Sequence, residues 1–172
     1  YGPFQYTHNP VNDPVIAVLC DKQARGRMDQ FAKLLRNGLD EEGGRFSGGL
    51  VGKFRLTNVR FQYAEIAGDT ADDYAAAAQR ILDELPQTPA LALVQVREAH
   101  KQRASGQNPY FVAKARFMRA GVPVQAVRLE TVEANRGKAY SLNNLALAAY
   151  AKIGGIPWVI STRGVATHEL VI

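Results

Sequence analysis

Two short apolar runs constrain the fold of this chain more than any other feature. Residues 14–20 read PVIAVLC, and residues 90–96 read ALALVQV. Runs of this length without polar alternation are typical of strands that are buried on both faces. Such strands occur in sheets that carry helices on each side. The two runs therefore favour a mostly parallel sheet inside an α/β protein.

Segments with helical periodicity separate these runs. Apolar residues at positions 28, 31, 34, 35 and 39 predict an amphipathic helix from Arg25 to Leu39. Residues 59–67 alternate as a strand, and the next helix takes Asp69 or Thr70 as its N-cap and stops before Pro86. Five glycines between positions 43 and 52 indicate a long loop, with a small hairpin expected around Phe54.

Residues 108–158 continue the alternation of strands and helices. Asn108 is a good N-cap, and Pro109 suits the first position of a helix. A strand over residues 122–127, a polar loop, a helix over residues 141–152 and a further strand follow. The whole order predicts a Rossmann-like α/β fold, with a mostly parallel central sheet and helices on both faces. Ligands of such folds bind beyond the carboxyl ends of the strands, where residues 97–107 would lie.

The composition excludes several classes of protein. The chain has 172 residues, 47% of them hydrophobic and 22% charged, which suits one globular domain. No apolar run approaches the roughly 20 residues of a membrane span, and the single Cys20 excludes an internal disulfide. We therefore expect a cytoplasmic monomer without membrane contact. The net charge of +5 tolerates a polyanionic partner, and Tyr1 in place of Met indicates a piece of a longer protein.

Familiar catalytic and phosphate-binding motifs do not occur in the sequence. Neither GxxxxGK[ST] nor GxGxxG is present, and there is no nucleophile elbow. His8, His100 and His168 are isolated and form no metal-ligand pattern. The motifs alone therefore point to no active site.

Residues 108–158 nevertheless carry five side chains that a plain core would not require: Tyr110, Lys114, Gln125, Asn144 and Lys152. Tyr110 and Lys114 lie one turn apart on one face of a predicted helix. Asn144 and Lys152 lie two turns apart on the next helix. An aromatic ring can stack on a base, and an ammonium group can hold a phosphate. We interpret the set as a receptor for a phosphorylated nucleotide.

Each of these residues also has a purely structural explanation. Tyr110 could pack on the core, and Lys114 could be solvated. Gln125 lies inside an apolar run and could bond to a nearby loop backbone. Lys152 would favour the dipole at a helix C-terminus, and Asn144 could belong to the polar side of its helix. The interpretation therefore rests on the five residues read together.

The same residues carry a resemblance to a known family. NPYFVAKARFMRAGVPVQAV, followed by NNLALAAYAKIGGIPWVI, resembles the MID domain of an Argonaute protein at its junction with the PIWI domain. The prokaryotic long Argonautes are the most similar, and the resemblance is strongest over residues 108–172. It implies a connecting arm at residues 1–13, a MID domain at residues 14–160 and the start of a PIWI domain at residues 161–172. The ending THELVI resembles relatives that have lost slicing.

The resemblance implies a site for the 5′-phosphorylated end of a small guide RNA or DNA. Tyr110 would stack on the first base, while Lys114, Gln125 and Lys152 would hold the 5′ phosphate. Asn144 would contact the same nucleotide, and residues 97–107 would face the edge of the first base. The family also implies Mg²⁺ or another divalent cation that bridges guide phosphates. Here Ala148 stands where some relatives have Gln, which leaves fewer side-chain ligands for the metal.

The resemblance further implies a role without catalysis. The chain would anchor a guide within an Argonaute, beside the PIWI domain of the same protein, for prokaryotic gene silencing and host defence. Any nuclease activity would belong to a PIWI domain outside this chain. Two alternatives stay open: an α/β enzyme that acts on a small phosphorylated nucleotide, and a structural spacer whose polar residues bond internally. A turnover assay with nucleotides and metal separates the enzyme from the binding domain.

Overall fold

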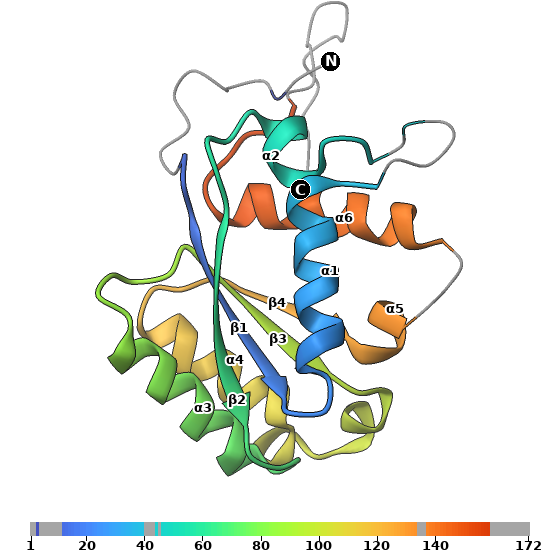
Figure 1. Cartoon of the computed structure of the whole chain (residues 1–172). Coiled ribbons are helices and arrows are strands. Elements are labelled where there is room, and N and C mark those ends of the chain that lie inside the picture. Colours follow the sequence, from blue (N-terminus) through green and yellow to red (C-terminus); the bar gives the residue numbers. More distant parts are fainter. Residues whose placement is uncertain (1–2, 4–11, 40–43, 45, 134–136, 159–172) are drawn as a thin grey trace, which may run out of the picture.

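A computed structural model describes residues 3, 12–39, 44, 46–133 and 137–158 of the chain. Its centre is a four-stranded sheet in the order β2-β1-β3-β4, and every pairing is parallel (Figure 1). The strands are β1 (Val15–Asp21), β2 (Arg60–Ile66), β3 (Leu91–Val96) and β4 (Val124–Arg128). The predicted α/β fold with a mostly parallel sheet is confirmed.

The two apolar runs form the two central strands. β1 pairs with β2 on one side and with β3 on the other, and residues 16–19 of β1 are fully buried. β3 is buried along its whole length. β2 lies at an edge and alternates between exposed and covered residues over its first half. Burial on both faces thus explains why polar alternation is missing from these two runs.

Helices cover both faces of the sheet (Figure 1). On one face, α1 (Arg25–Asn37), α2 (Gly49–Phe54), α5 (Leu129–Glu133) and α6 (Lys138–Lys152) share a buried core with Ile16, Val18 and Leu93. On the other face, α3 (Ala71–Glu84) and α4 (Pro109–Arg119) pack with Ala17 and Leu19. Two 3-10 helices, η1 (Glu98–Gln102) and η2 (Ser105–Gln107), connect β3 to α4. Within the described ranges, every helix is too short or too polar to cross a membrane.

The hairpin expected around Phe54 is wrong, because this segment forms the helix α2. Phe46, Leu50 and Phe54 are buried four residues apart, and the Phe54 ring stacks on Tyr150 with 4.1 Å between centroids. Gly49 has φ +56°, and a Cβ there would lie 2.4 Å from the backbone oxygen of Arg36. The glycines therefore serve close backbone packing, and their number hid the helical spacing of the apolar residues.

Some predicted features differ from the structure or lie beyond what it describes. The polar loop expected after β4 contains the short helix α5, whose Leu129 and Val132 are buried. The strand expected after α6 and the predicted PIWI start at residues 161–172 fall outside the described residues. Most of the predicted arm at residues 1–13 does so too. These domain boundaries stay predictions.

We expect Thr70→Ala to lower the free energy of unfolding by about 1 kcal/mol, because Thr70 is the N-cap of α3. The Asp73 backbone N–H donates to Thr70 Oγ1 at 3.2 Å, and the Thr70 backbone N–H donates to Asp73 Oδ2 at 3.0 Å. Alanine leaves the first of these donors without its partner. Urea denaturation measures the change, with Thr70→Ser as the control that keeps the hydroxyl. Equal stability of the alanine and serine variants would contradict the role of the cap.

Candidate functional site

A hollow of about 460 Å³ opens beyond the carboxyl ends of β3 and β4, at the sheet edge where α/β folds bind ligands. Its wall comes from the end of β3, from η1, from the first turn of α4 and from β4. The lining residues are Val96, Arg97, His100, Lys101, Asn108, Tyr110, Phe111, Gln125, Ala126 and Arg128. The fold thus brings two of the predicted site residues, Tyr110 and Gln125, to one hollow.

Tyr110 is held at the start of α4 by local backbone chemistry. Pro109 occupies the first turn, and the Tyr110 backbone N–H donates to Asn108 Oδ1 at 3.0 Å. The Tyr110 side chain is half-buried, and the Lys114 Nζ lies 6.0 Å from the centre of its ring. Burial raises the pKa of Tyr110, so its hydroxyl stays neutral at physiological pH. A neutral, half-buried ring that lines the hollow is suited to stacking.

Gln125 and Lys152 are in direct contact. The Lys152 ammonium donates to Gln125 Oε1 and to the Val124 carbonyl oxygen, both at 2.7 Å. The Gln125 amide nitrogen donates to the Ala126 carbonyl oxygen at 3.0 Å. The structural explanation of Gln125 therefore holds for its nitrogen, which bonds to backbone. Its oxygen instead orients Lys152, which the sequence did not reveal.

The charge of Lys114 acts on Lys152. Desolvation by burial lowers the pKa of Lys152, and the positive charge of Lys114 lowers it further. In the part of the chain that the structure describes, neither lysine has an acidic partner within ion-pair distance. A like charge nearby disfavours the ammonium form of Lys152, and a bound anion would offset this repulsion. The structure thus brings together four predicted residues: Tyr110, Lys114, Gln125 and Lys152.

Asn144 lies in a neighbouring hollow of about 300 Å³. It is exposed on α6, and Gln125, Ala126 and Arg128 line this hollow as well as the first one. Thr131 and Ser141 add hydroxyl groups to its wall. Asn144 is therefore linked to the Tyr110 hollow through β4, without lining it.

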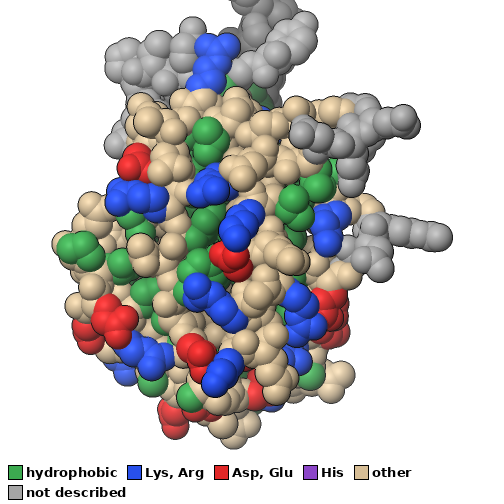
Figure 2. All heavy atoms as spheres, in the orientation of Figure 1, with side chains coloured by type: hydrophobic (Ala, Val, Ile, Leu, Met, Phe, Trp, Pro, Cys, Tyr) green, Lys and Arg blue, Asp and Glu red, His purple; other side chains and the backbone are tan. Residues whose placement is uncertain are grey.

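Most cations near the Tyr110 hollow already have acidic partners. Arg97 pairs with Asp21 at 2.7 Å, and Lys101 and Arg128 pair with Glu98 at 2.7 and 3.1 Å. Figure 2 shows a similar mixture on the face that carries α1, where acidic side chains lie among Lys and Arg. These three cations around the hollow are thus paired with carboxylates. Lys114 and Lys152 differ from these cations, because neither has an acidic partner among the described residues.

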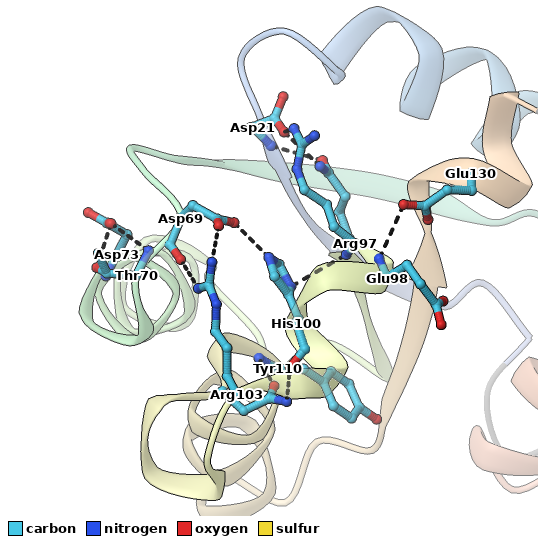
Figure 3. A network of polar contacts seen from close by, with 12 residues as sticks. Asp21, Asp69, Thr70, Asp73, Arg97, Glu98, His100, Arg103, Tyr110 and Glu130 are labelled. Carbon is cyan, nitrogen blue, oxygen red and sulfur yellow. Dashed lines mark hydrogen bonds and ion pairs between the residues drawn. The ribbon is translucent and has the colours of Figure 1, made fainter.

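A buried polar network, which sequence reasoning missed, fixes the strand ends (Figure 3). Gln95 is fully buried in β3; its amide nitrogen donates to Asp21 Oδ2 at 2.7 Å, and its oxygen accepts from the Asp21 backbone N–H at 3.0 Å. Burial would raise the pKa of Asp21, but the hydrogen bonds it accepts, from Gln95 first, hold that pKa below its ordinary value. One signal was available: Gln95, like Gln125, is a lone amide inside an apolar run.

His100, which looked isolated in the sequence, belongs to a second part of the network. Its ring is buried, and Nε2 lies 2.6 Å from Asp69 Oδ1 in the turn between β2 and α3. Arg103 pairs with the same carboxylate. Burial would raise the pKa of Asp69, but the bonds from His100 and Arg103 hold it below its usual value. These partners lie more than thirty residues apart in sequence, so no local pattern reveals them.

The expected Mg²⁺ finds no ready-made site among these side chains. The described residues contain no group of three or more His, Cys, Asp or Glu side chains that could hold a metal ion. The oxygen of Gln125 already accepts a bond from Lys152. The bridging cation therefore stays a prediction.

Comparisons with known proteins show what the chain is similar to. No protein-family model matches it. Over its whole length it is 29% identical to "Protein argonaute" from Cereibacter sphaeroides, of which it spans 23%. Drosophila Piwi has a similar fold, with a TM-score of 0.59 and 20% identity over 86% of this chain and 18% of that one. Aa-Ago, solved with externally bound siRNA, gives 0.59 and 18% identity over 88% and 20%.

Proposed function

We propose, from the similarity of this chain to Argonaute and Piwi proteins, that it binds the 5′-phosphorylated end of a small guide nucleic acid. It would anchor the first nucleotide of an RNA or DNA guide within a larger Argonaute. The observation that carries this proposal is the Lys114–Lys152 pair beside Gln125 and Tyr110.

The phosphate would bind at the lysine pair. Lys152 uses two of its three ammonium hydrogens on Gln125 and Val124, which fixes its position and leaves the third hydrogen for a ligand. A terminal phosphate brings negative charge to a place where two ammonium groups repel each other. Charge-assisted hydrogen bonds stabilise by about 1.5–3 kcal/mol each. The pair therefore favours a 5′ phosphate over a 5′ hydroxyl.

The first base would stack on Tyr110. The ring lies within 6.0 Å of the Lys114 ammonium, so a base on the ring places its 5′ phosphate near the lysines. The hollow of about 460 Å³ falls within the range of small-ligand sites. Arg97, His100 and Lys101 supply polar groups along its wall. Asn144 would contact the same nucleotide from the adjoining hollow.

The proposed role is positioning rather than chemistry. The four residues provide a ring, an amide and two ammonium groups, which bind and orient a nucleotide end. Guide-directed silencing and any cleavage would depend on a PIWI domain of the same protein. The chain spans 23% of its curated relative, so the activity of the whole protein is part of this proposal.

We expect a 5′-phosphorylated oligonucleotide to bind at least tenfold more tightly than its 5′-hydroxyl form, because one charge-assisted hydrogen bond corresponds to roughly that factor. Fluorescence titration of RNA and DNA versions of one sequence measures both ratios. Affinity should also fall as salt rises, since phosphate contacts release counterions. Equal binding of the two 5′ ends would overturn the proposal. Turnover of a bound nucleotide would instead favour the enzyme alternative.

A further inference from the structure

The loop at residues 97–107 is fastened at a point outside the hollow that it lines. Asp69, in the turn between β2 and α3, receives the ring of His100 at 2.6 Å and the guanidinium of Arg103 (Figure 3). We name these three residues the clasp. Asp69 is half exposed and lines other surface hollows, whereas His100 lines the hollow of Tyr110. The clasp thus joins the part of the loop that lines the Tyr110 hollow to the turn that follows β2.

The ring of His100 is oriented from three sides. Its Nδ1 accepts from the Arg97 backbone N–H at 3.4 Å, which assigns the proton to Nε2 and makes that nitrogen the donor to Asp69. The edge of Tyr74 packs against the ring, with 5.7 Å between centroids at 85°. The side chain is 3% exposed. A buried ring with both nitrogens bonded holds one orientation.

A second contact extends from His100 to the stacking residue. The Asn108 side-chain nitrogen donates to the His100 carbonyl oxygen at 2.8 Å, and Asn108 Oδ1 accepts from the Tyr110 backbone N–H at 3.0 Å. Asn108 is 6% exposed, so water does not readily replace these bonds. One buried amide therefore joins the loop to the first turn of α4.

We propose that the clasp positions the loop and Tyr110 for the first base, and that Asp69 is a positioning residue for base recognition although it lies outside the hollow. This inference rests on the proposed function. The loop consists of two short 3-10 helices, and most of its residues are exposed. Fixing it before the nucleotide arrives lowers the ordering cost of binding.

Charge alone predicts the opposite effect, which makes Asp69 a useful test position. A carboxylate near a nucleic-acid site repels phosphate, so its removal would strengthen binding if only long-range electrostatics mattered. If the clasp positions the loop, removal weakens binding. Asp72 is an exposed acid three residues later, in the first turn of α3, and among the described residues no ion pair joins it to the loop. Asp72→Ala is therefore the matched control for charge.

We expect Asp69→Ala to weaken binding of a 5′-phosphorylated oligonucleotide roughly three- to tenfold, and Asp72→Ala to leave it unchanged or slightly tighter. The affinities for four oligonucleotides that differ only in the first base should converge in Asp69→Ala. The ratio between 5′-phosphate and 5′-hydroxyl forms should stay at the wild-type value, because the lysine pair lies outside the clasp. Asp69→Asn keeps an acceptor for His100 and should recover part of the loss.

Hydrogen exchange on the free chain tests the positioning step without any ligand. Asp69→Ala should speed amide exchange over residues 97–110, including the amide of Tyr110, and leave β1 and β3 protected. Unchanged exchange would overturn the clasp whatever the binding data show. Faster exchange with unchanged affinity and base preference would overturn its link to the hollow. If the wild-type chain bound the 5′-phosphate and 5′-hydroxyl forms equally, the proposed function would be overturned, and this inference with it.

Discussion

Lys152→Met should lower the affinity for a 5′-phosphorylated oligonucleotide roughly 10- to 150-fold and remove most of its advantage over the 5′-hydroxyl form. The expected loss corresponds to about 1.5–3 kcal/mol, the contribution of a hydrogen bond to a charged group. Methionine keeps much of the packing volume of lysine but carries no ammonium group. The 5′-hydroxyl form should bind the variant almost as tightly as it binds the wild type. This comparison separates phosphate recognition from other contacts. Titration of both forms measures the difference.

Lys138→Met is the matched control, since Lys138 lies at the other end of α6 and lines neither hollow among the described residues. If both variants lose affinity equally, general electrostatics rather than a phosphate site explains the effect.

The pH dependence of phosphate binding offers a second check. Burial and Lys114 lower the pKa of Lys152, and the ammonium is the binding form. Phosphate-dependent affinity should therefore begin to fall at a lower pH than an ordinary lysine would allow.

Tyr110→Ala should weaken binding of both the 5′-phosphate and the 5′-hydroxyl form by about 1–3 kcal/mol, or roughly 5- to 150-fold, because base stacking on an aromatic side chain contributes that much. Tyr110→Phe keeps the ring and should bind nearly as the wild type does. The two variants therefore separate the ring from the hydroxyl group. Fluorescence titration at fixed salt provides the comparison.

An oligonucleotide without its first base gives the sharpest control for Tyr110. If stacking carries the effect, Tyr110→Ala and the wild type should bind this abasic strand equally. Tyr140→Ala removes a tyrosine that is 59% exposed on α6 and should change neither affinity. A loss of affinity for the abasic strand would assign Tyr110 a structural role in α4 instead. Binding of the 5′ phosphate by Lys152 would then still be testable, but stacking of the first base on Tyr110 would be ruled out.

Much of the fold was predictable, because the patterns behind it are local. PVIAVLC and ALALVQV indicate buried strands from their own composition, and β1 and β3 are indeed the central pair. The N-cap Asn108 was predicted, and Thr70 was one of two candidates for the cap of α3, because cap side chains bond within three residues of themselves. The helix α2 escaped prediction, since its buried Leu50 and Phe54 lie within or beside a glycine-rich stretch.

The sequence by itself determined the order of the four strands and of the longer helices between them, and it supplied the residues proposed for the site, since periodicity and helix caps act over a few residues. Only the tertiary structure decided which of those residues meet. Lys152 reaches Gln125 across 27 positions, and Gln95 reaches Asp21 across 74. His100, isolated in sequence, becomes buried against Asp69 only after β2 and β3 enter one sheet. Such contacts depend on how the elements pack, because hydrogen bonds and charge pairs form between neighbours in space, whatever their separation along the chain.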